Sequence, residues 1–448
     1  MRTLKKIAVQ ALVVGAYLLL ASSSALAGIP IEHWTQASGA QVFLVDSPAI
    51  PMVDVQVDFD AGSRRDPAPQ AGLAGVTADM MEKGVLARAG APALDENQLG
   101  EAWADLGASF GAGAGGERMS FSLRSLTDPA LLDQAVALAA RQLGEPAFPD
   151  AVWRRERERL AAALKEARTR PATVASLAYA HAVYGDHPYG QELTEATLAR
   201  IGVSDMRALH ARLLRPCRAK VSLVGALNRA QADALVTRLL ARLPAGADCA
   251  ALPTVPEVAS LAAAREQRLP FDSAQAHVLL GQPGYRRDDP AYFALLVGNY
   301  TLGGGGFVSR LYQAVREQRG LSYSVYSAFS PGLHAGAFTI GLQTRPDQAD
   351  QALQVAREVL ARFVAEGPTE AELQAAKDNL IGGFALRLDS NRKLLDNVAG
   401  IAWYGLPLDY LETWTPQVQR VTAAEVRAAF ARVLQPARMV TVLVGARP

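Results

Sequence analysis

The feature that most restricts how this chain can fold is an internal repeat. Residues 201–225 align without a gap on residues 421–445, and ten of the 25 paired positions are identical. A shorter match, Gly62–Asp66 (GSRRD) with Gly284–Asp288 (GYRRD), recurs at nearly the same spacing. Solenoid repeats have periods of about 20–50 residues. The period here is near 220 residues, so we interpret it as the duplication of a whole domain.

Each copy contains the patterns of both helices and strands. In residues 201–225 an amphipathic stretch ends at a proline and a short apolar run follows, which predicts a helix and then a strand. The apolar runs Val53–Phe59 and His277–Gly281 precede the shorter matches and are expected to be strands. Trp153–Arg168 has the spacing of an amphipathic helix. We therefore expect an α+β fold in which helices cover one side of a largely antiparallel sheet in each half.

The repeat also sets the expected domain boundaries. We place an N-terminal domain at 28–244 and a C-terminal domain at 269–448. The segment between them, 245–268, is rich in Ala and Pro and lacks periodicity, so it is expected to be a linker.

The first 27 residues have the pattern of a secretory signal. A basic start with Arg2, Lys5 and Lys6 precedes an apolar stretch from Ile7 to Ala21, and the small residues 25–27 (ALA) form a cleavage pattern. The alternative is an uncleaved anchor, but the stretch falls short of the about 20 residues that cross a bilayer. We expect cleavage after Ala27 and export, with the periplasm as the compartment. No later stretch is long and apolar enough to predict a membrane span.

Charge and cysteine content narrow the range of partners. Lys and Arg number 45 against 44 Asp and Glu, so the net charge gives no reason to expect a nucleic acid or an anionic membrane as partner. The two cysteines, Cys217 and Cys249, are too few for a disulfide scaffold. They can pair in an oxidising compartment, and the sequence leaves open whether they do.

The region after the first strand resembles the start of the insulinase-like (pitrilysin, M16) metallopeptidase family. The resemblance rests on Gly62-Ser-Arg followed by Gly72–Met80 (GLAGVTADM). Active members carry H-x-x-E-H on this helix, where two histidines bind zinc and the glutamate is the general base for the zinc-bound water. Here Gly75 and Asp79 stand at the histidine positions and Ala78 at the position of the base. The zinc motif is therefore degenerate.

The resemblance implies a third zinc ligand from a glutamate on a later helix. Glu156, Glu158 and Glu166 are all candidates, and the sequence does not distinguish them. A zinc site elsewhere has little support, because no two of the six histidines are four residues apart; they are His33, His181, His187, His210, His277 and His334. We interpret them as surface or hydrogen-bonded histidines, and expect no metal or other cofactor in this chain.

The second half resembles the C-terminal domain of the same family. A Gly-rich turn, Gly303–Gly306, leads into a helix, and Arg316 is followed seven residues later by Tyr323. The resemblance implies that Gly303, Gly304, Gly305 and Gly306 contact substrate and that Arg316 and Tyr323 are catalytic. Both side chains can donate hydrogen bonds to the oxyanion of peptide hydrolysis or to substrate carbonyls. The alternative is a helix-surface charge and a half-buried strand aromatic.

A third glycine cluster, Gly111–Gly116 (GAGAGG), matches the dinucleotide-binding fingerprint. That fingerprint requires a helix immediately after it, whereas Met119–Leu126 alternates like a strand. The resemblance implies instead an edge strand against which a substrate peptide lies. Gly113, Gly115 and Gly116 would permit a close approach of the peptide backbone.

Together these features predict the non-metal subunit of a heterodimeric zinc peptidase. Its partner would be a homologous chain with an intact H-x-x-E-H motif, and its substrates short or unfolded peptides. One alternative is a family member without proteolytic activity that binds peptides or serves structurally. A hydrolase with an unrecognised metal or nucleophile is a further alternative, but we find no Ser/His/Asp arrangement that supports it.

Overall fold

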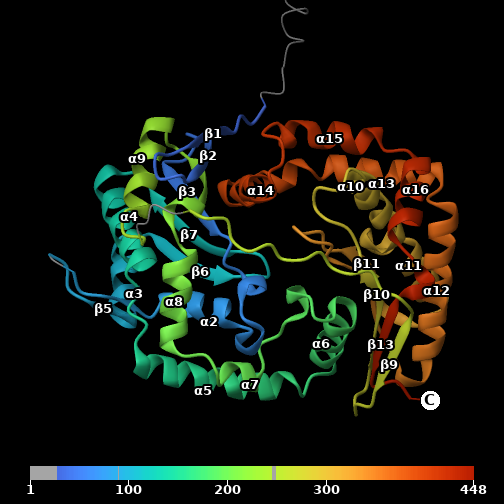
Figure 1. Cartoon of the computed structure of the whole chain (residues 1–448). Coiled ribbons are helices and arrows are strands. Elements are labelled where there is room, and N and C mark those ends of the chain that lie inside the picture. The colour runs from blue at the N-terminus through green and yellow to red at the C-terminus, as the bar shows by residue number, and fades with distance from the viewer. Residues whose placement is uncertain (1–27, 89, 245–248, 448) are drawn as a thin grey trace, which may run out of the picture.

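The computed structural model describes residues 28–88, 90–244 and 249–447. The expected signal segment, 1–27, and residues 245–248 of the expected linker lie outside the described residues. The chain forms two halves, each built on its own β-sheet and joined by the linker (Figure 1). This arrangement confirms the α+β fold with a duplicated domain.

The N-terminal half contains a six-stranded sheet with the order β1-β2-β8-β3-β7-β6. Only the pairing of β2 with β8 is parallel. The predicted strand at Val53–Phe59 is confirmed as β3. The bounds are β1 (Glu32–Thr35), β2 (Gln41–Asp46), β3 (Met52–Phe59), β6 (Ser109–Ala114), β7 (Met119–Leu126) and β8 (Lys220–Gly225), with a separate pair β4 (Gly84–Val85) and β5 (Leu94–Asp95).

The C-terminal half contains a five-stranded sheet with the order β11-β12-β10-β13-β9. Its parallel pair is β13 with β9. The bounds are β9 (Arg265–Leu269), β10 (Ala276–Pro283), β11 (Ser322–Phe329), β12 (Ala337–Thr344) and β13 (Val440–Val444). Strand β9 begins inside the expected linker, so the C-terminal sheet recruits the end of that segment.

Helices follow the amphipathic stretches. The N-terminal half has α2 (Leu73–Met81), α3 (Glu96–Asp105), α4 (Pro129–Gly144), α5 (Asp150–Ala167), α6 (Pro171–Tyr184), α7 (Glu195–Leu198), α8 (Val203–Leu213) and α9 (Arg229–Leu240). The C-terminal half has α10 (Tyr292–Asn299), α11 (Arg310–Tyr312), α12 (Ala349–Glu366), α13 (Glu370–Gly382), α14 (Asn391–Tyr404), α15 (Tyr410–Arg420) and α16 (Ala423–Val433). The repeated segment folds alike in both halves, because α8 and α16 each lead through a short 3₁₀ turn into β8 and β13.

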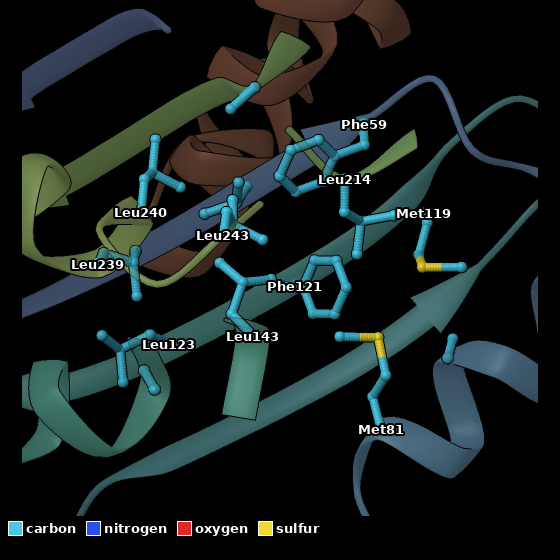
Figure 2. Packing of buried hydrophobic residues seen from close by; sticks show 14 of the residues in the cluster. Phe59, Met81, Met119, Phe121, Leu123, Leu143, Leu214, Leu239, Leu240 and Leu243 are labelled. Atoms are coloured by element: carbon cyan, nitrogen blue, oxygen red, sulfur yellow. The ribbon is translucent and has the colours of Figure 1, made fainter. Parts of the chain in front are cut away.

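The core of the N-terminal half lies between its sheet and its own helices. Phe59 of β3 and Phe121 of β7 meet edge to face with ring centroids 6.0 Å apart. Met119 of β7, Met81 of α2 and Leu143 of α4 belong to the same buried cluster (Figure 2). A separate cluster fills the corresponding space in the C-terminal half.

The second face of each sheet is covered by a helix from the other half. Helix α6 packs on β10 and β13, and its Tyr179 hydroxyl donates a hydrogen bond to the Phe338 carbonyl at 2.6 Å. Helix α14 packs on β8 and β3 in return, and Lys220 Nζ donates to the Ala402 carbonyl at 2.7 Å. The two halves therefore exchange helices across their interface (Figure 1).

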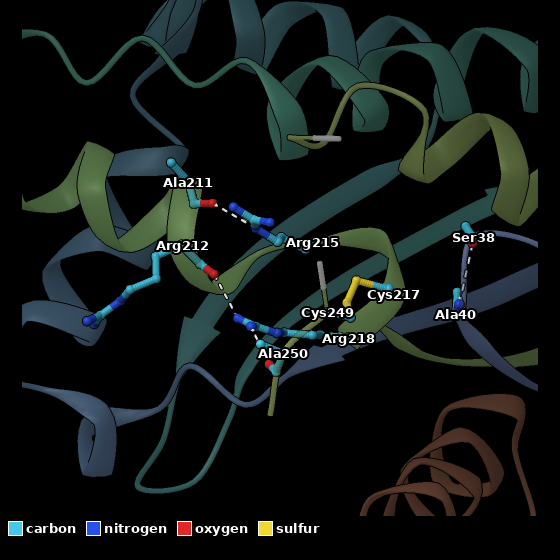
Figure 3. Close-up of a disulfide and its surroundings, with 9 residues drawn as sticks. All are labelled: Ser38, Ala40, Ala211, Arg212, Arg215, Cys217, Arg218, Cys249 and Ala250. Atoms are coloured by element: carbon cyan, nitrogen blue, oxygen red, sulfur yellow. Dashed lines mark hydrogen bonds between the residues drawn. A yellow bond between two sulfur atoms is a disulfide. The ribbon is translucent and has the colours of Figure 1, made fainter. Parts of the chain in front are cut away.

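Cys217 and Cys249 form a disulfide, with their Cα atoms 6.2 Å apart (Figure 3). The bond ties the start of the described linker to the N-terminal half just before β8. The sequence had left this pairing open.

Candidate functional site

Helix α2, which would carry a zinc motif, begins with a well-formed cap. The Asp66 carboxylate accepts hydrogen bonds from the backbone N–H groups of Gly72 (2.9 Å) and Ala74 (3.0 Å). Gly72 has a φ of 99°, a left-handed conformation that favours glycine. Burial raises the pKa of Asp66 to about 7, although both N–H bonds act in the opposite direction. The turn therefore fixes the helix in place whatever its motif positions carry.

The three degenerate motif positions differ in their surroundings. Gly75 has open space where a Cβ would stand, and Ala78 is buried in the core. Asp79 lies at a cavity of about 210 Å³. Partial burial raises the pKa of Asp79, and the positive charges of Arg159 and Lys83 oppose this shift. One carboxylate remains where an active member would have two histidines and a base.

The structure distinguishes the three glutamates that the sequence could not. Glu156 of α5 lines the cavity beside Asp79, whereas Glu158 and Glu166 are exposed and do not line it. Glu156 Oε2 accepts a hydrogen bond from Arg159 Nε at 2.7 Å. That bond holds the pKa of Glu156 below its usual range. Of the three glutamates, Glu156 is thus the one that lies at the cavity beside Asp79, and it is engaged by arginine.

Cations compensate the carboxylates around this cavity. Arg155 Nη2 bridges Glu156 Oε1 (2.9 Å) and Glu96 Oε2 (2.8 Å), and Lys83 also pairs with Glu96. Within the described part of the chain, no group of three or more His, Cys, Asp or Glu could hold a metal ion. All residues that line the cavity lie between positions 76 and 160. The arrangement is an ion-pair network around Glu156, with the Asp79 carboxylate beside it.

Arg316 and Tyr323 are brought together in the C-terminal half. The Arg316 guanidinium carbon lies 4.4 Å from the centroid of the Tyr323 ring, a cation–π distance. Tyr323 is 79% exposed, and none of the described residues hydrogen-bonds its hydroxyl. The sequence left open that Tyr323 is a half-buried aromatic residue of a strand. Its exposure contradicts that alternative.

A break in strand register directs Tyr323 outward. Ser322 pairs with Thr344 and Ser324 with Gln343, so Tyr323 is the extra residue of a bulge in β11. The Ser322 hydroxyl donates to the Gln343 carbonyl at 2.6 Å and thereby supports this geometry. Bulges re-aim side chains and are frequent beside active sites.

Two aromatic residues that the sequence analysis missed complete the setting of Arg316. Its guanidinium carbon lies 4.7 Å from the Tyr312 ring centroid and 5.9 Å from that of Phe307, and Arg316 Nη1 donates to the Tyr312 hydroxyl. Tyr312 precedes Arg316 by four residues, a spacing that places both on one helical face and could have indicated the pair. Phe307, at 70% exposure, belongs to the Gly-rich turn and had no such signal.

Packing explains most of the glycines in the Gly-rich turn, because a Cβ would collide with neighbouring atoms at three of the four positions. A Cβ on Gly303 would stand 2.4 Å from the Ser327 nitrogen, and one on Gly304 would stand 2.7 Å from the Asn299 amide nitrogen. A Cβ on Gly305 would likewise meet Tyr300 at 2.7 Å. Gly306 has a φ of 59° and open space around it. Substrate contact at these positions stays a prediction, with Gly306 the least constrained by packing.

The glycines after β6 are partly engaged within the chain. The carbonyls of Gly115 and Gly116 accept hydrogen bonds from Ser63 N and Arg64 N, each at 2.9 Å. The outward N–H of Ala112 in the edge strand β6 donates to Glu82 Oε1 at 2.7 Å. Gly113 has open space at its Cβ position, as do Gly115 and Gly116. Peptide binding along this edge stays a prediction, and a peptide would have to displace Glu82.

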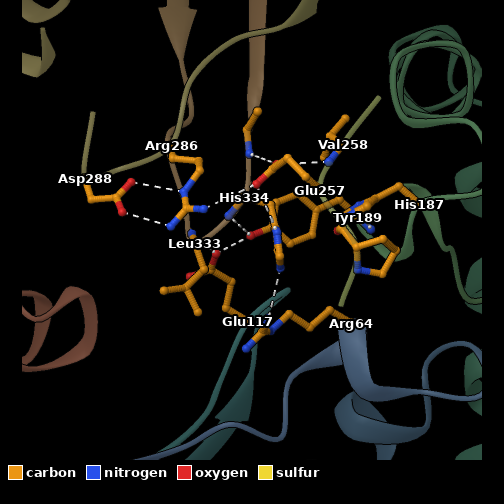
Figure 4. A network of polar contacts seen from close by, with 12 residues as sticks. Arg64, Glu117, His187, Tyr189, Glu257, Val258, Arg286, Asp288, Leu333 and His334 are labelled. Carbon is orange, nitrogen blue, oxygen red and sulfur yellow. Dashed lines mark hydrogen bonds and ion pairs between the residues drawn. The ribbon is translucent and has the colours of Figure 1, made fainter. Parts of the chain in front are cut away.

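A polar network that sequence reasoning missed joins the two halves (Figure 4). Arg64 donates to His334 Nε2 at 3.2 Å, and His334 Nδ1 lies 3.4 Å from Glu257 Oε2. The rings of His187 and His334 are 5.3 Å apart, although the two residues are far apart in sequence. Burial lowers the pKa of His187, whose Nε2 donates to the Pro256 carbonyl at 2.9 Å. The network holds the halves and the linker together.

Comparison with known families and proteins places these features in context. Residues 41–197 match the profile described as insulinase (peptidase family M16), and residues 200–380 match that of the peptidase M16 inactive domain. The crystal structure of a peptidase M16 inactive domain from Pseudomonas fluorescens is 34% identical. It has a TM-score of 0.87 and covers 93% of this chain and 98% of that one.

Two curated relatives illustrate the range of similar proteins. An uncharacterized zinc protease of Streptomyces coelicolor is 30% identical over 57% of this chain and 57% of its own length. A non-peptidase homologue of Helicobacter pylori is 25% identical over 86% of this chain and 87% of its own. The chain spans little more than half the length, 57% and 56%, of the first two curated relatives that it matches. No helix of the described residues is both long enough and apolar enough to cross a membrane.

Proposed function

Because the chain belongs to the peptidase M16 family, we propose that it is the non-metal subunit of a two-chain zinc peptidase. In this assembly a second family member with an intact H-x-x-E-H motif holds the zinc. This chain supplies Arg316 and Tyr323 to the partner's site. The proposal rests on the Tyr323 hydroxyl, which points outward beside Arg316 at a strand bulge and has no hydrogen-bond partner in the described part of the chain.

The chemistry of the pair suits peptide hydrolysis. Zinc held by the partner would supply an activated water, and addition of that water to a substrate carbonyl would place negative charge on the carbonyl oxygen. The Tyr323 hydroxyl donates a hydrogen bond to that oxygen, and the Arg316 guanidinium donates to it or to a neighbouring substrate carbonyl. The rings of Tyr312 and Phe307 limit the positions open to Arg316. The donors are therefore oriented before the charge develops. Donors held in this way stabilise the charge most effectively, because they need no rearrangement during the reaction.

Substrate class and compartment complete the proposal. Two chains that close around the site would admit short or unfolded peptides and exclude folded proteins. The signal pattern of residues 1–27 supports export to the periplasm. There, the chain works beside its partner in processing or degrading peptides.

A second candidate function is a peptide-binding or structural subunit without any role in catalysis. The ion pairs of Glu156 favour it, since Arg155 and Arg159 already engage that carboxylate. The non-peptidase name of the Helicobacter pylori relative points the same way for that protein. The two candidate functions differ in whether Tyr323 affects the rate of peptide hydrolysis by the complex.

The test is the kinetics of the complex formed by co-expressing this chain with an H-x-x-E-H homologue. Tyr323→Phe removes one hydroxyl and keeps the ring, so kcat should fall by about 10²–10³ with a smaller change in KM. Tyr326→Phe makes the same change three residues along β11 and should leave kcat unaltered.

An unchanged kcat in the Tyr323→Phe complex would contradict the catalytic proposal and support the second candidate. Melting temperatures of both variants show whether the fold has been kept. Arg316→Ala should affect both kcat and KM if the guanidinium also holds the substrate backbone.

A further inference from the structure

The linker contacts two duplicated turns of the N-terminal half, and we call this contact surface the N-terminal groove. One is η4 (Pro216–Arg218) and the other is η1 (Ser63–Arg65). Arg218 Nη2 donates to the Ala250 carbonyl at 2.9 Å, and Arg65 Nη1 donates to the Pro253 carbonyl. Arginines of the two turns thus bind the main chain of an extended segment. The Cys217–Cys249 disulfide holds that segment in place (Figure 3).

The duplication places the same two turns in the C-terminal half, where they border a cavity whose remaining wall includes linker residues within 257–261. The turns are η10 (Pro436–Arg438) and Gly284–Asp288, and Arg438 is the counterpart of Arg218. Arg287, the counterpart of Arg65, does not line the cavity and donates to the Tyr410 hydroxyl. The cavity between them has a volume of about 500 Å³, within the range of about 300–1,000 Å³ usual for ligand pockets. Ala437 stands in the place of Cys217, so no disulfide can tie a segment here.

The hydrogen-bonding capacity of this cavity is only partly used. Arg286 pairs with Asp288 at 2.8 Å, and Arg432 pairs with Asp289 at 2.7 Å. Among the described residues, nothing forms a hydrogen bond or ion pair with the Arg438 guanidinium. Its counterpart in the N-terminal half, Arg218, binds the linker carbonyl of Ala250. A donor therefore remains free at the corresponding position.

The charges around the cavity indicate what kind of acceptor fits. Three arginines (Arg286, Arg432 and Arg438) face three carboxylates (Glu257, Asp288 and Asp289), so the formal charges of the lining balance. Figure 4 shows Arg286 beside two of these carboxylates, those of Glu257 and Asp288. A free anion would meet the carboxylates as well as the arginines. A neutral main chain rich in carbonyl oxygens satisfies Arg438 without that repulsion.

We infer that this cavity is a docking groove for an extended segment of unfolded peptide, with a main-chain carbonyl bound by Arg438. The bond from Arg218 to the Ala250 carbonyl shows how Arg438 would hold one carbonyl of such a segment. Unlike the linker, a peptide in the C-terminal groove is not covalently tied, so it can exchange. The groove gives the chain a peptide-binding site of its own, apart from the Arg316/Tyr323 pair.

The inference can be tested on the purified full chain without any zinc partner. The probe is a fluorescently labelled, end-blocked peptide that copies linker residues 249–255 with serine in place of Cys249, and binding is followed by anisotropy. Arg438→Ala should weaken binding at least about tenfold, because a hydrogen bond from a charged donor contributes about 1.5–3 kcal/mol. Arg427→Ala, an exposed arginine of α16 outside the groove, serves as the matched control and should change nothing.

Equal affinity in the Arg438→Ala and Arg427→Ala variants would overturn the inference, as would the absence of any binding to the unaltered chain. Loss of binding in Arg218→Ala but not in Arg438→Ala would place the peptide in the N-terminal groove instead. Because no catalysis is measured, failure here would leave the Tyr323 experiment untouched.

Discussion

The two halves contain the same turn and use it in opposite ways. In the N-terminal half Asp66 is buried and caps α2 through Gly72 and Ala74. In the C-terminal half its counterpart Asp288 is exposed and pairs with Arg286 at the edge of an open cavity. Duplication supplied identical residues, and the surroundings decided whether they stabilise the fold or remain at the surface.

The two halves also differ in whether their candidate functional side chains have partners. Around Asp79 and Glu156 the negative charges are matched by cations of the same half. Around Arg316 a tyrosine hydroxyl is held outward with no partner among the described residues. Glu156 thus has partners within its own half. Groups that remain unpaired and supported by neighbours are therefore the places at which to look for function.

The largest expected effect comes from the disulfide, which only the N-terminal groove has. Cys217→Ser opens a loop of 32 residues and should lower the free energy of unfolding by about 2–4 kcal/mol. Urea denaturation measures this change. A reducing agent should produce the same loss in the unaltered chain and none in the variant. Equal stability of the oxidised chain and the Cys217→Ser variant would mean that the two grooves do not differ in this respect.

A smaller effect separates the two aspartates. Asp66→Ala removes a helix cap and leaves the N–H groups of Gly72 and Ala74 without their acceptor, so we expect a loss of about 1–2 kcal/mol. Asp288→Ala breaks only an exposed ion pair and should stay within about 0.5 kcal/mol. Thermal unfolding of the two variants side by side makes the comparison. Similar losses in both would show that burial does not distinguish the duplicated turns.

The smallest effect on stability is expected at Glu156, in the cavity beside Asp79. Glu156→Gln weakens bonds to Arg155 and Arg159, whose side chains are more than half exposed, so the loss of stability should stay below about 1 kcal/mol. Glu158→Gln on the same helix is the control and should be neutral. Zinc content should be the same before and after the change. Stoichiometric zinc in the unaltered chain that disappears in Glu156→Gln would reverse our interpretation of this cavity.

The fold was largely predictable because its signals are local or repeated. The repeat predicted two similar halves, and apolar runs predicted strands such as β3. Helix α5 was expected at Trp153–Arg168 and begins slightly earlier, at Asp150, directly after Pro149. Strand β9 was missed because Arg265–Leu269 is mostly polar and pairs only through β13. Such a segment becomes a strand only through pairing with a distant segment, and the local sequence does not reveal that pairing.

The candidate site was predictable only in part. Arg316 and Tyr323 were found through a family pattern, and the structure places them together. Selecting Glu156 among three glutamates required the position of α5 against α2. The block of Ala112 by Glu82 and the contact of His187 with His334 join segments with no local relation in the sequence. Tertiary contacts of this kind leave no pattern that periodicity or spacing can reveal.

The exchange of α6 and α14 bears on the ancestry of the chain. Each sheet is completed by a helix that belongs to the other copy of the repeat. A single ancestral copy would have left one apolar face of its sheet in water, whereas two copies related by a twofold axis would each have covered the other. The chain therefore has the architecture of a symmetric homodimer whose two subunits are joined in one chain.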